Sequence, residues 1–343
     1  MLKKKQIAMG VLLWMLVFGA FVTLAGIGDF VDRLSQISAT ELALILSAVG
    51  VGVVSMGSAL YVIGRSVELG LGLIESIFLN TSVSLAHNLT PFGQAGGAPI
   101  GAAILSQRSD GHYEECLAAL SAKDAVSFVP AILVFFFGGL YILLFEQAVP
   151  DALRPLFGAF SLFVVVIVGG AIAIYRYPDA MRRLLGRLVG AVNRAAARLP
   201  LLPSLEEEEL EERLANFTSS FGELAADRRT IVIASALATS AFIAQGTLLW
   251  LTLDAVGIDI SVALAIFTVQ VSLLASGLPL PGGSGGVEGT QVLMLVTITG
   301  AASAPTITAV VLSRGLVFWT PIVLGSITLL VLGVDTVADE EIV

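Results

Sequence analysis

The sequence predicts an all-α, polytopic membrane helix bundle of about eight spans, in which proline and glycine break the helix at two places. Three observations predict this class. Hydrophobic residues make up 56% of the 343 residues and charged residues only 13%, whereas a soluble domain has about 25% charged residues. The apolar residues are gathered in long runs, and two similar Pro/Gly-rich segments interrupt those runs.

Several apolar runs contain few or no charged side chains, and each is near the roughly 20 residues that a helix needs to cross a bilayer. They are residues 6–27, 41–64, 125–145, 156–175, 230–253, 260–280 and 315–333, with weaker candidates at 67–90 and 287–300. The first run follows a basic start, as in a signal peptide. It is too long for one and lacks a clear small-x-small cleavage site, so we expect it to remain as the first span.

Positive charges near span ends predict the orientation, because basic loops stay on the cytoplasmic side. Lys3, Lys4 and Lys5 precede the first span, and arginines are concentrated in residues 176–198. Both regions are therefore predicted to be cytoplasmic, and the span count places the C-terminus there too. The expected location is the cell (plasma) membrane.

The basic stretch is followed by the acidic stretch "SLEEEELEERL", and together they divide the chain. We expect a first membrane half at 1–175, a cytoplasmic loop at 176–229 and a second membrane half at 230–343. The net charge is −9 and the pI about 4.8. This acidity fits a high-salt cytoplasm and equally fits an ordinary acidic helix. Nucleic acid is not expected as a partner.

Each membrane half contains one segment broken by proline and glycine. The first is "NLTPFGQAGGAPIGAAIL", with its break near 90–105, and the second is "SGLPLPGGSGGVEGTQVL", with its break near 278–300. Paired broken segments are the best sequence indication of a transporter binding site. A packing kink or simple loop is the alternative interpretation, and two matched breaks disfavour it. Because an odd number of crossings would invert one half, the halves are candidates for inverted repeats, with breaks that are re-entrant or unwound.

A helix break in hydrocarbon frees backbone groups that lipid cannot satisfy, so it survives only beside protein or a wet cavity. The freed N–H groups at the start of a half-helix favour an anion such as a phosphate head group. The predicted substrate-binding residues are the small and polar ones around both breaks, together with a nearby pair of charges: Gln94, Gly96, Gly97, Pro281, Gly283, Gly285, Gly286, Glu288 and Arg314.

Glu288 opens the segment after the second break. A carboxylate at a helix start is stabilised by the helix dipole and acts as a cap. Within a membrane an unpaired charge costs about 3 kcal/mol, so a functional role is expected. Arg314, at the start of the last span, is its natural partner. The pair is either purely structural or opened by an anionic substrate that binds Arg314, and we favour the second interpretation.

Residues 67–90 are unusually polar for a span, and the polar positions recur at helical spacing. Interhelical hydrogen bonding explains such a stripe in many membrane bundles. The more specific interpretation is a hydrophilic groove that leads to the first break and includes Glu75, Asn80 and His87. Lys123 and Asp124 are interpreted as part of an interfacial charge cluster.

Other kinds of site receive little support. A single cysteine and two histidines exclude an internal disulfide and make a metal site improbable. Residues 282–286 fit G-x-S-x-G, but a nucleophile elbow needs a strand before it and a helix after it. No P-loop motif is present. We expect no cofactor and no enzymatic activity, and we interpret Gln245 and Gln270 as packing residues.

Three stretches resemble the flippase-like transmembrane region of lysylphosphatidylglycerol synthases. They are "LTPFGQAGGAPIGAAILSQRSDGHYEECLAAL", "LPLPGGSGGVEG" and "LSRGLVFWTPIVLG", and the resemblance covers nearly the whole chain. The most specific motif is Pro-x-Pro-Gly-Gly-x-Gly-x-x-Glu, from Pro279 to Glu288. The resemblance implies a multi-helix bundle with two broken or re-entrant segments, and movement of a lipid between leaflets. The family includes stand-alone members, some tied to archaeal protein glycosylation.

Aminoacyl-lipid synthases of this family carry a soluble catalytic domain after the membrane part, whereas this sequence ends at Val343. We therefore do not carry the synthase activity over. The expected function is a flippase or scramblase for an anionic phospholipid or a polyprenyl-phosphate-linked lipid. The alternatives are an integral membrane enzyme and an accessory subunit of a lipid-linked glycan or aminoacyl-lipid pathway. The expected partners are membrane lipids with anionic head groups; a homo-oligomer and glycosylation or envelope machinery are further candidates.

Overall fold

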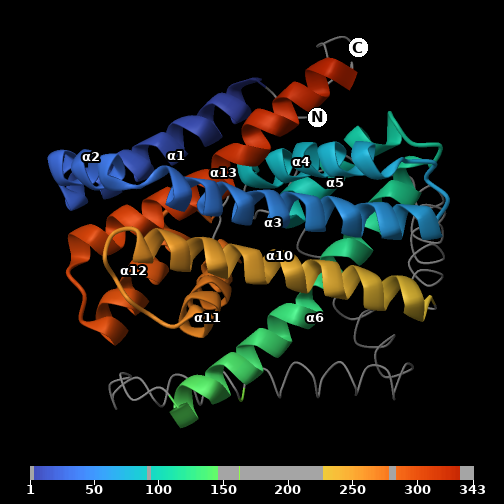
Figure 1. Ribbon diagram of the computed structural model, residues 1–343. Helices are drawn as coiled ribbons and strands as arrows, with labels where there is room; N and C mark the ends of the chain where they lie inside the picture. Colours follow the sequence, from blue (N-terminus) through green and yellow to red (C-terminus); the bar gives the residue numbers. More distant parts are fainter. Residues whose placement is uncertain (1–3, 91–93, 146–161, 163–226, 278–282, 333–343) are drawn as a thin grey trace, which may run out of the picture.

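The computed structural model describes residues 4–90, 94–145, 162, 227–277 and 283–332. The regular elements within these ranges are all helices, which confirms the all-α class (Figure 1). The predicted cytoplasmic loop at 176–229 and the predicted span at 156–175 lie outside the described residues, apart from residues 162 and 227–229.

Two helices at the N-terminus form a bent pair. α1 (Lys4–Ala25) and α2 (Ile27–Gln36) meet at 89°. Gly26 lies at the bend with φ of +86°, a conformation that glycine adopts at no steric cost. α1 packs along α13 (Ser303–Leu332), the last described helix (Figure 1). The bend thus keeps the first apolar segment against the end of the chain.

The first half continues with four helices in chain order: α3 (Ala39–Ser66), α4 (Leu73–Leu89), α5 (Gln94–Ser106) and α6 (Tyr113–Phe145). A reciprocal capping box starts α3. The Glu41 backbone N–H donates to Ser38 Oγ at 3.2 Å, and the Ser38 N–H donates to Glu41 Oε2 at 2.7 Å. These bonds satisfy donors that the first helical turn cannot pair.

The second half has the same order of elements: α10 (Arg228–Asp254), α11 (Val262–Ser272) continued by the 3₁₀ turn η1 (Leu273–Gly277), α12 (Gly286–Thr299) and α13. Side-chain caps define two of the starts. Asp227 accepts from the backbone N–H groups of Arg229 and Thr230, and Ser261 accepts from Leu264. Asp227 is exposed, and these hydrogen bonds, led by those from Thr230, lower the pKa of its carboxyl.

The two halves have the same order of helices and run in opposite directions, an arrangement expected of inverted repeats. The four helices have 28, 17, 13 and 33 residues in the first half, and 27, 11, 14 and 30 in the second, where η1 adds 5 to α11. α3 and α10 lie side by side and run in opposite directions, and α6 runs opposite to α13 (Figure 1).

Close helix packing occurs at equivalent positions of the two repeats. Gly57 is the nineteenth residue of α3 and Gly246 is the nineteenth of α10. A Cβ at Gly57 would collide with the backbone of Ile77, the fifth residue of α4. A Cβ at Gly246 would collide with the backbone of Ile266, the fifth residue of α11. Small residues permit such close backbone approach in membrane bundles, so each pair of helices is fixed by the same contact.

Four described helices are long and apolar enough to cross a membrane: α3, α6, α10 and α13. The α1–α2 pair makes a fifth if it is counted as one span. Of the predicted span at 260–280, the described residues show α11 and η1 from Val262 to Gly277, and residues 278–280 lie outside them. α4 and α12 occupy the weaker candidates and are also short.

We expect Gly246→Ala to destabilise the protein, because the added methyl would overlap the Ile266 backbone and separate α10 from α11. Overpacking of this kind costs about 1–3 kcal/mol. Thermal unfolding in detergent should show a melting temperature lower by a few degrees. Gly50→Ala in α3 is the matched control, since no atom lies within 4 Å of its added methyl. Equal melting temperatures for the two variants would contradict this packing.

Candidate functional site

The second break ends in two glycines whose backbone conformation other residues rarely adopt. Gly283 has φ of +69° and Gly285 has φ of +85°, and both values lie in the left-handed region that favours glycine. A Cβ at Gly283 would stand 2.9 Å from the Cα of Ser276. The chain after the break therefore lies directly against η1, and Gly286 then begins α12. Pro281 lies outside the described residues.

Glu288 makes two contacts that fix the start of α12. Its Oε2 accepts a hydrogen bond from the Gly285 backbone N–H at 2.7 Å, and its Oε1 accepts one from Arg314 Nε at 3.1 Å. Glu288 is only 4% exposed. Glu288 therefore has both of the roles considered for it, as the cap of a helix and as the partner of Arg314.

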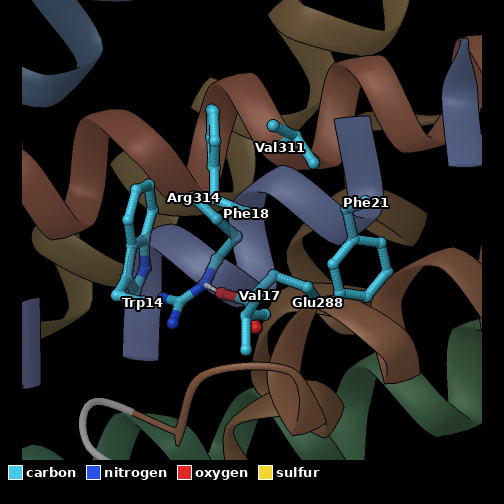
Figure 2. A pocket seen from close by; sticks show the side chains of 7 residues that line it. All are labelled: Trp14, Val17, Phe18, Phe21, Glu288, Val311 and Arg314. Atoms are coloured by element: carbon cyan, nitrogen blue, oxygen red, sulfur yellow. Dashed lines mark hydrogen bonds and ion pairs between the residues drawn. The ribbon is translucent and has the colours of Figure 1, made fainter. Parts of the chain in front are cut away.

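Arg314 projects from α13 into the same place, and its side chain is 13% exposed. A narrow pocket lies beside the ion pair, between α1, α12 and α13. Figure 2 shows Arg314 and Glu288 meeting between Trp14 on one side and Phe21 on the other. The lining residues are Trp14, Val17, Phe18, Phe21, Glu288, Val311 and Arg314.

An aromatic wall from α1 and α13 borders this pocket. The Trp14 ring stacks on Phe18 at 4.7 Å and on Phe318 at 4.5 Å between ring centroids, and it meets Trp319 edge-on at 5.2 Å. Stacked aromatic pairs have specific geometry and bury large apolar areas. The site therefore places an apolar wall next to a buried ion pair, an arrangement that suits an amphipathic ligand.

A second narrow pocket lies at the other side of Arg314, where α10, α12 and α13 contribute polar side chains. Gln245, Gln291 and Ser313 line it together with Arg314. Gln291 Nε2 donates to Ser272 Oγ at 2.9 Å, whereas its Oε1 has no hydrogen-bond partner in the described ranges. Arg314 thus stands between an aromatic and an amide-lined pocket.

The first break brings its two arms into direct contact. Gln94 and Gly96 lie in the first turn of α5, and a Cβ at Gly97 would collide with the ring and backbone of His87. His87 is 9% exposed, and its Nε2 has no hydrogen-bond partner among the residues that the structure covers. The described residues of this break therefore gather at the α4–α5 junction, and Gly97 does not line either pocket at Arg314.

Two predicted groove residues, Asn80 and His87, face the interior, and Glu75 does not. Lys123 Nζ donates to Asn80 Oδ1 at 2.8 Å and lies 3.9 Å from Asp124 Oδ1. Glu75 instead forms a more exposed ion pair with Arg108, at 3.6 Å. In this conformation Asn80 and His87 belong to packed helix contacts.

Sequence reasoning missed three residues of these sites. Lys123 is 5% exposed, so the interfacial interpretation overlooked its burial. The sequence offered one indication, because Lys123 is the single lysine after residue 5. Gln291 follows Glu288 by three residues and so shares its helical face. Trp14 gave no signal, because an aromatic residue in an apolar run is ordinary.

Helix α4 connects the two breaks through α13. Asn88 Nδ2 donates to the Phe318 carbonyl at 3.3 Å, and Ser82 Oγ donates to the Gly325 carbonyl at 3.1 Å. Phe318 belongs to the aromatic wall beside Arg314. The arm that leads into the first break is thereby packed on the helix that carries the cation of the second.

Comparison with known proteins agrees with this architecture. The model of the family described as "Lysylphosphatidylglycerol synthase TM region" matches residues 7–325, which include both breaks and the Glu288–Arg314 pair. The chain is also similar to a UPF0104 membrane protein of Methanothermobacter thermautotrophicus, with 26% identity over 265 residues that cover 74% of each chain. The protein is therefore an integral membrane protein that belongs to the family of lysylphosphatidylglycerol synthase transmembrane regions.

Proposed function

We propose that this protein is a flippase- or scramblase-type transporter that moves an anionic lipid between the leaflets of the cell membrane. The observation that carries the proposal is the buried Glu288–Arg314 ion pair at the start of a broken helix. Charged residues within a membrane bundle commonly mark a substrate pathway. A stand-alone transport function needs no catalytic residue, and we propose none.

Arg314 is suited to a phosphate head group. A guanidinium presents a planar fork of donors that matches the oxygens of a phosphate or carboxylate. In the described conformation Glu288 already supplies such oxygens, at 3.1 Å from Nε. An entering phosphodiester would replace one anion by another, so Arg314 would not be left as an unpaired buried charge at any stage.

The side chains on the two sides of Arg314 suit the two parts of a lipid. The Trp14 side offers aromatic and aliphatic side chains, which suit an acyl or prenyl chain. The opposite side offers Gln245, Gln291 and Ser313, which suit the hydroxyl groups of a glycerol or sugar head group. The substrate class is therefore an anionic phospholipid or a polyprenyl-phosphate-linked lipid.

The inverted repeats support transport rather than a static assembly role. Transporters built from such repeats place their substrate site where the repeats meet, and they alternate access by moving one part against the other. α3 and α10 form that central contact here, with Ser55 Oγ donating to Ser240 Oγ at 3.2 Å. The basic residues at the N-terminus and at 176–198 lead us to place both termini on the cytoplasmic side.

Arg314→Gln should slow lipid translocation roughly tenfold or more, because a neutral amide loses the charge-assisted bonds to phosphate. The measurement uses the full chain in liposomes with fluorescent phosphatidylglycerol and an impermeant quencher. Arg314→Lys should retain part of the rate, since it keeps the charge and loses the fork. Arg108→Gln is the control, because it removes a more exposed ion pair.

A wild-type rate for Arg314→Gln would exclude the head-group role and favour an accessory subunit, for which the pair is structural. If the wild-type protein moves neither labelled phosphatidylglycerol nor a labelled polyprenyl phosphate, the transport proposal itself is wrong. Chemical turnover of either lipid would instead identify an integral membrane enzyme.

Glu288→Gln should keep the hydrogen bond that caps α12 and remove the negative charge beside Arg314. The glutamine carbonyl still accepts from the Gly285 N–H, while the competitor for Arg314 loses its charge. We expect several-fold tighter binding of dihexanoylphosphatidylglycerol to the purified protein, measured by thermophoresis, together with slower translocation. Dihexanoylphosphatidylcholine, which carries no net charge, should bind equally to both proteins. Weaker binding of the anionic lipid by Glu288→Gln would show that Glu288 does not compete for Arg314.

A further inference from the structure

A second buried cation lies at a place in the first half that is comparable to that of Arg314 in the second. Lys123 lies in α6, the fourth helix of its repeat, seven residues before Pro130. Arg314 lies in α13, the fourth helix of the other repeat, seven residues before Pro321. Neither lysine nor arginine is common inside a membrane bundle, so a buried cation seven residues before the proline of the fourth helix in each half calls for a common explanation.

The breaks are matched too, in a register that differs by two residues from that of the cations, since Lys123 follows Gly97 by 26 residues and Arg314 follows Gly286 by 28. Gly97 follows Gly57 by the same number of residues as Gly286 follows Gly246. The paired glycines of the two breaks are therefore equivalent, at the first turns of α5 and α12. Each cation follows its break by one short helix and the first part of a long one.

Lys123 is brought toward the first break by the packing of α5 on α6. A Cβ at Gly101 in α5 would stand 3.1 Å from Leu120 Cδ1 in α6. A short loop joins these two helices, so they run back along each other. The next turn of α6, which carries Lys123, therefore lies toward the first turn of α5, as Arg314 lies at the first turn of α12.

The surroundings of Lys123 contain unsatisfied hydrogen-bonding groups. The ammonium has three donors, and its hydrogen bond among the described residues is to the neutral amide of Asn80. Asp124 is at 3.9 Å, beyond hydrogen-bonding distance. His87, which lies within electrostatic range of Lys123, is buried against the first turn of α5 with Nε2 unpartnered among the described residues. Buried polar atoms without a partner are rare in folded proteins, and a polar ligand would satisfy these.

We propose that Lys123, His87 and the first turn of α5 form a second subsite for the phosphate of the same lipid, facing the opposite leaflet from Arg314. This inference rests on the proposed transport function. The repeats are inverted, so equivalent residues face opposite sides of the membrane. A head group that leaves Arg314 would then meet Lys123 before it reaches the other leaflet.

The two subsites differ in one chemical respect. The position equivalent to Glu288 in the first repeat is Pro99, so no carboxylate caps α5 and competes for the cation there. Asp124 supplies the negative charge instead, from the adjacent position on α6. Both pockets described above border Arg314 and neither is lined by Lys123.

The first test compares translocation of fluorescent phosphatidylglycerol by full-length variants in liposomes. We expect Lys123→Met to lose at least about tenfold in rate and Lys123→Arg to keep most of it, since a phosphate subsite needs a cation. Arg108→Gln again serves as the control for removal of an ion pair. A wild-type rate for Lys123→Met would overturn the proposal.

A double variant separates a head-group role from a structural one. Lys123→Met alone leaves Asp124 buried without its partner, which can impair folding. Lys123→Met with Asp124→Asn restores neutrality. If the pair only stabilises α6, the double variant should regain the wild-type rate and the proposal is wrong. If Lys123 binds the head group, the double variant should melt near the wild-type temperature and remain slow.

A binding measurement keeps the second subsite separate from the transport function. Purified protein is titrated with dihexanoylphosphatidylglycerol, and in separate arms with inorganic phosphate and dihexanoylphosphatidylcholine. We expect the double variant to bind the anionic lipid at least about fivefold more weakly than wild type. Phosphate should compete only weakly if the ligand is a lipid head group.

If wild type binds the anionic lipid but does not translocate it, the proposed function fails while a weaker affinity in the double variant still supports the subsite. If the double variant binds as tightly as wild type, the subsite is wrong whether or not the protein transports. If wild type binds neither anion, both proposals fail. Inorganic phosphate bound as tightly as the lipid would identify a free anion as the ligand and contradict the lipid assignment.

Discussion

The structure depends on one carboxylate that satisfies two groups at once. A helix that begins inside a membrane bundle exposes backbone N–H groups, and a buried arginine needs an anion. Glu288 accepts from the Gly285 N–H at 2.7 Å and from Arg314 Nε at 3.1 Å. Because both donors share this single acceptor group, the start of α12 and the middle of α13 are held together by it. The second break is tolerable within the bundle for this reason.

The same arrangement makes the ion pair exchangeable. An anionic ligand that binds Arg314 replaces the oxygen atoms of Glu288 by its own, so the desolvated guanidinium keeps a partner. Glu288 would then retain only its bond to Gly285, which belongs to the same short helix. The link between α12 and α13 would thus weaken when a ligand arrives, and ligand binding would be coupled to the position of α12. The coupling needs no distant signal, because one side chain carries both contacts.

Composition and the cost of burying charges predicted much of this structure from the sequence. The apolar runs predicted the helical class, the Pro/Gly clusters located both breaks, and the cost of a charge in hydrocarbon predicted the partnership of Glu288 with Arg314. Hydropathy did not indicate that the α-helix of the 260–280 run would change to the 3₁₀ turn η1 at Leu273. The interfacial interpretation of Lys123 rested on the charged residues near it in the sequence, whereas its hydrogen bond is to Asn80 on another helix. Such tertiary contacts have no local signature.

The inverted repeats also limit which parts of the molecule can move. The contacts of Gly57 with Ile77 and of Gly246 with Ile266 join backbones directly, so α3 with α4 and α10 with α11 form two rigid pairs. Any rearrangement must then involve α5 and α12, the short helices after the breaks, and the long helices α6 and α13. Each long helix contains an internal proline, at which a helix bends most readily. Lys123 and Arg314 each lie about two turns before that proline, so a change of bend would move both cations relative to the pairs that surround them.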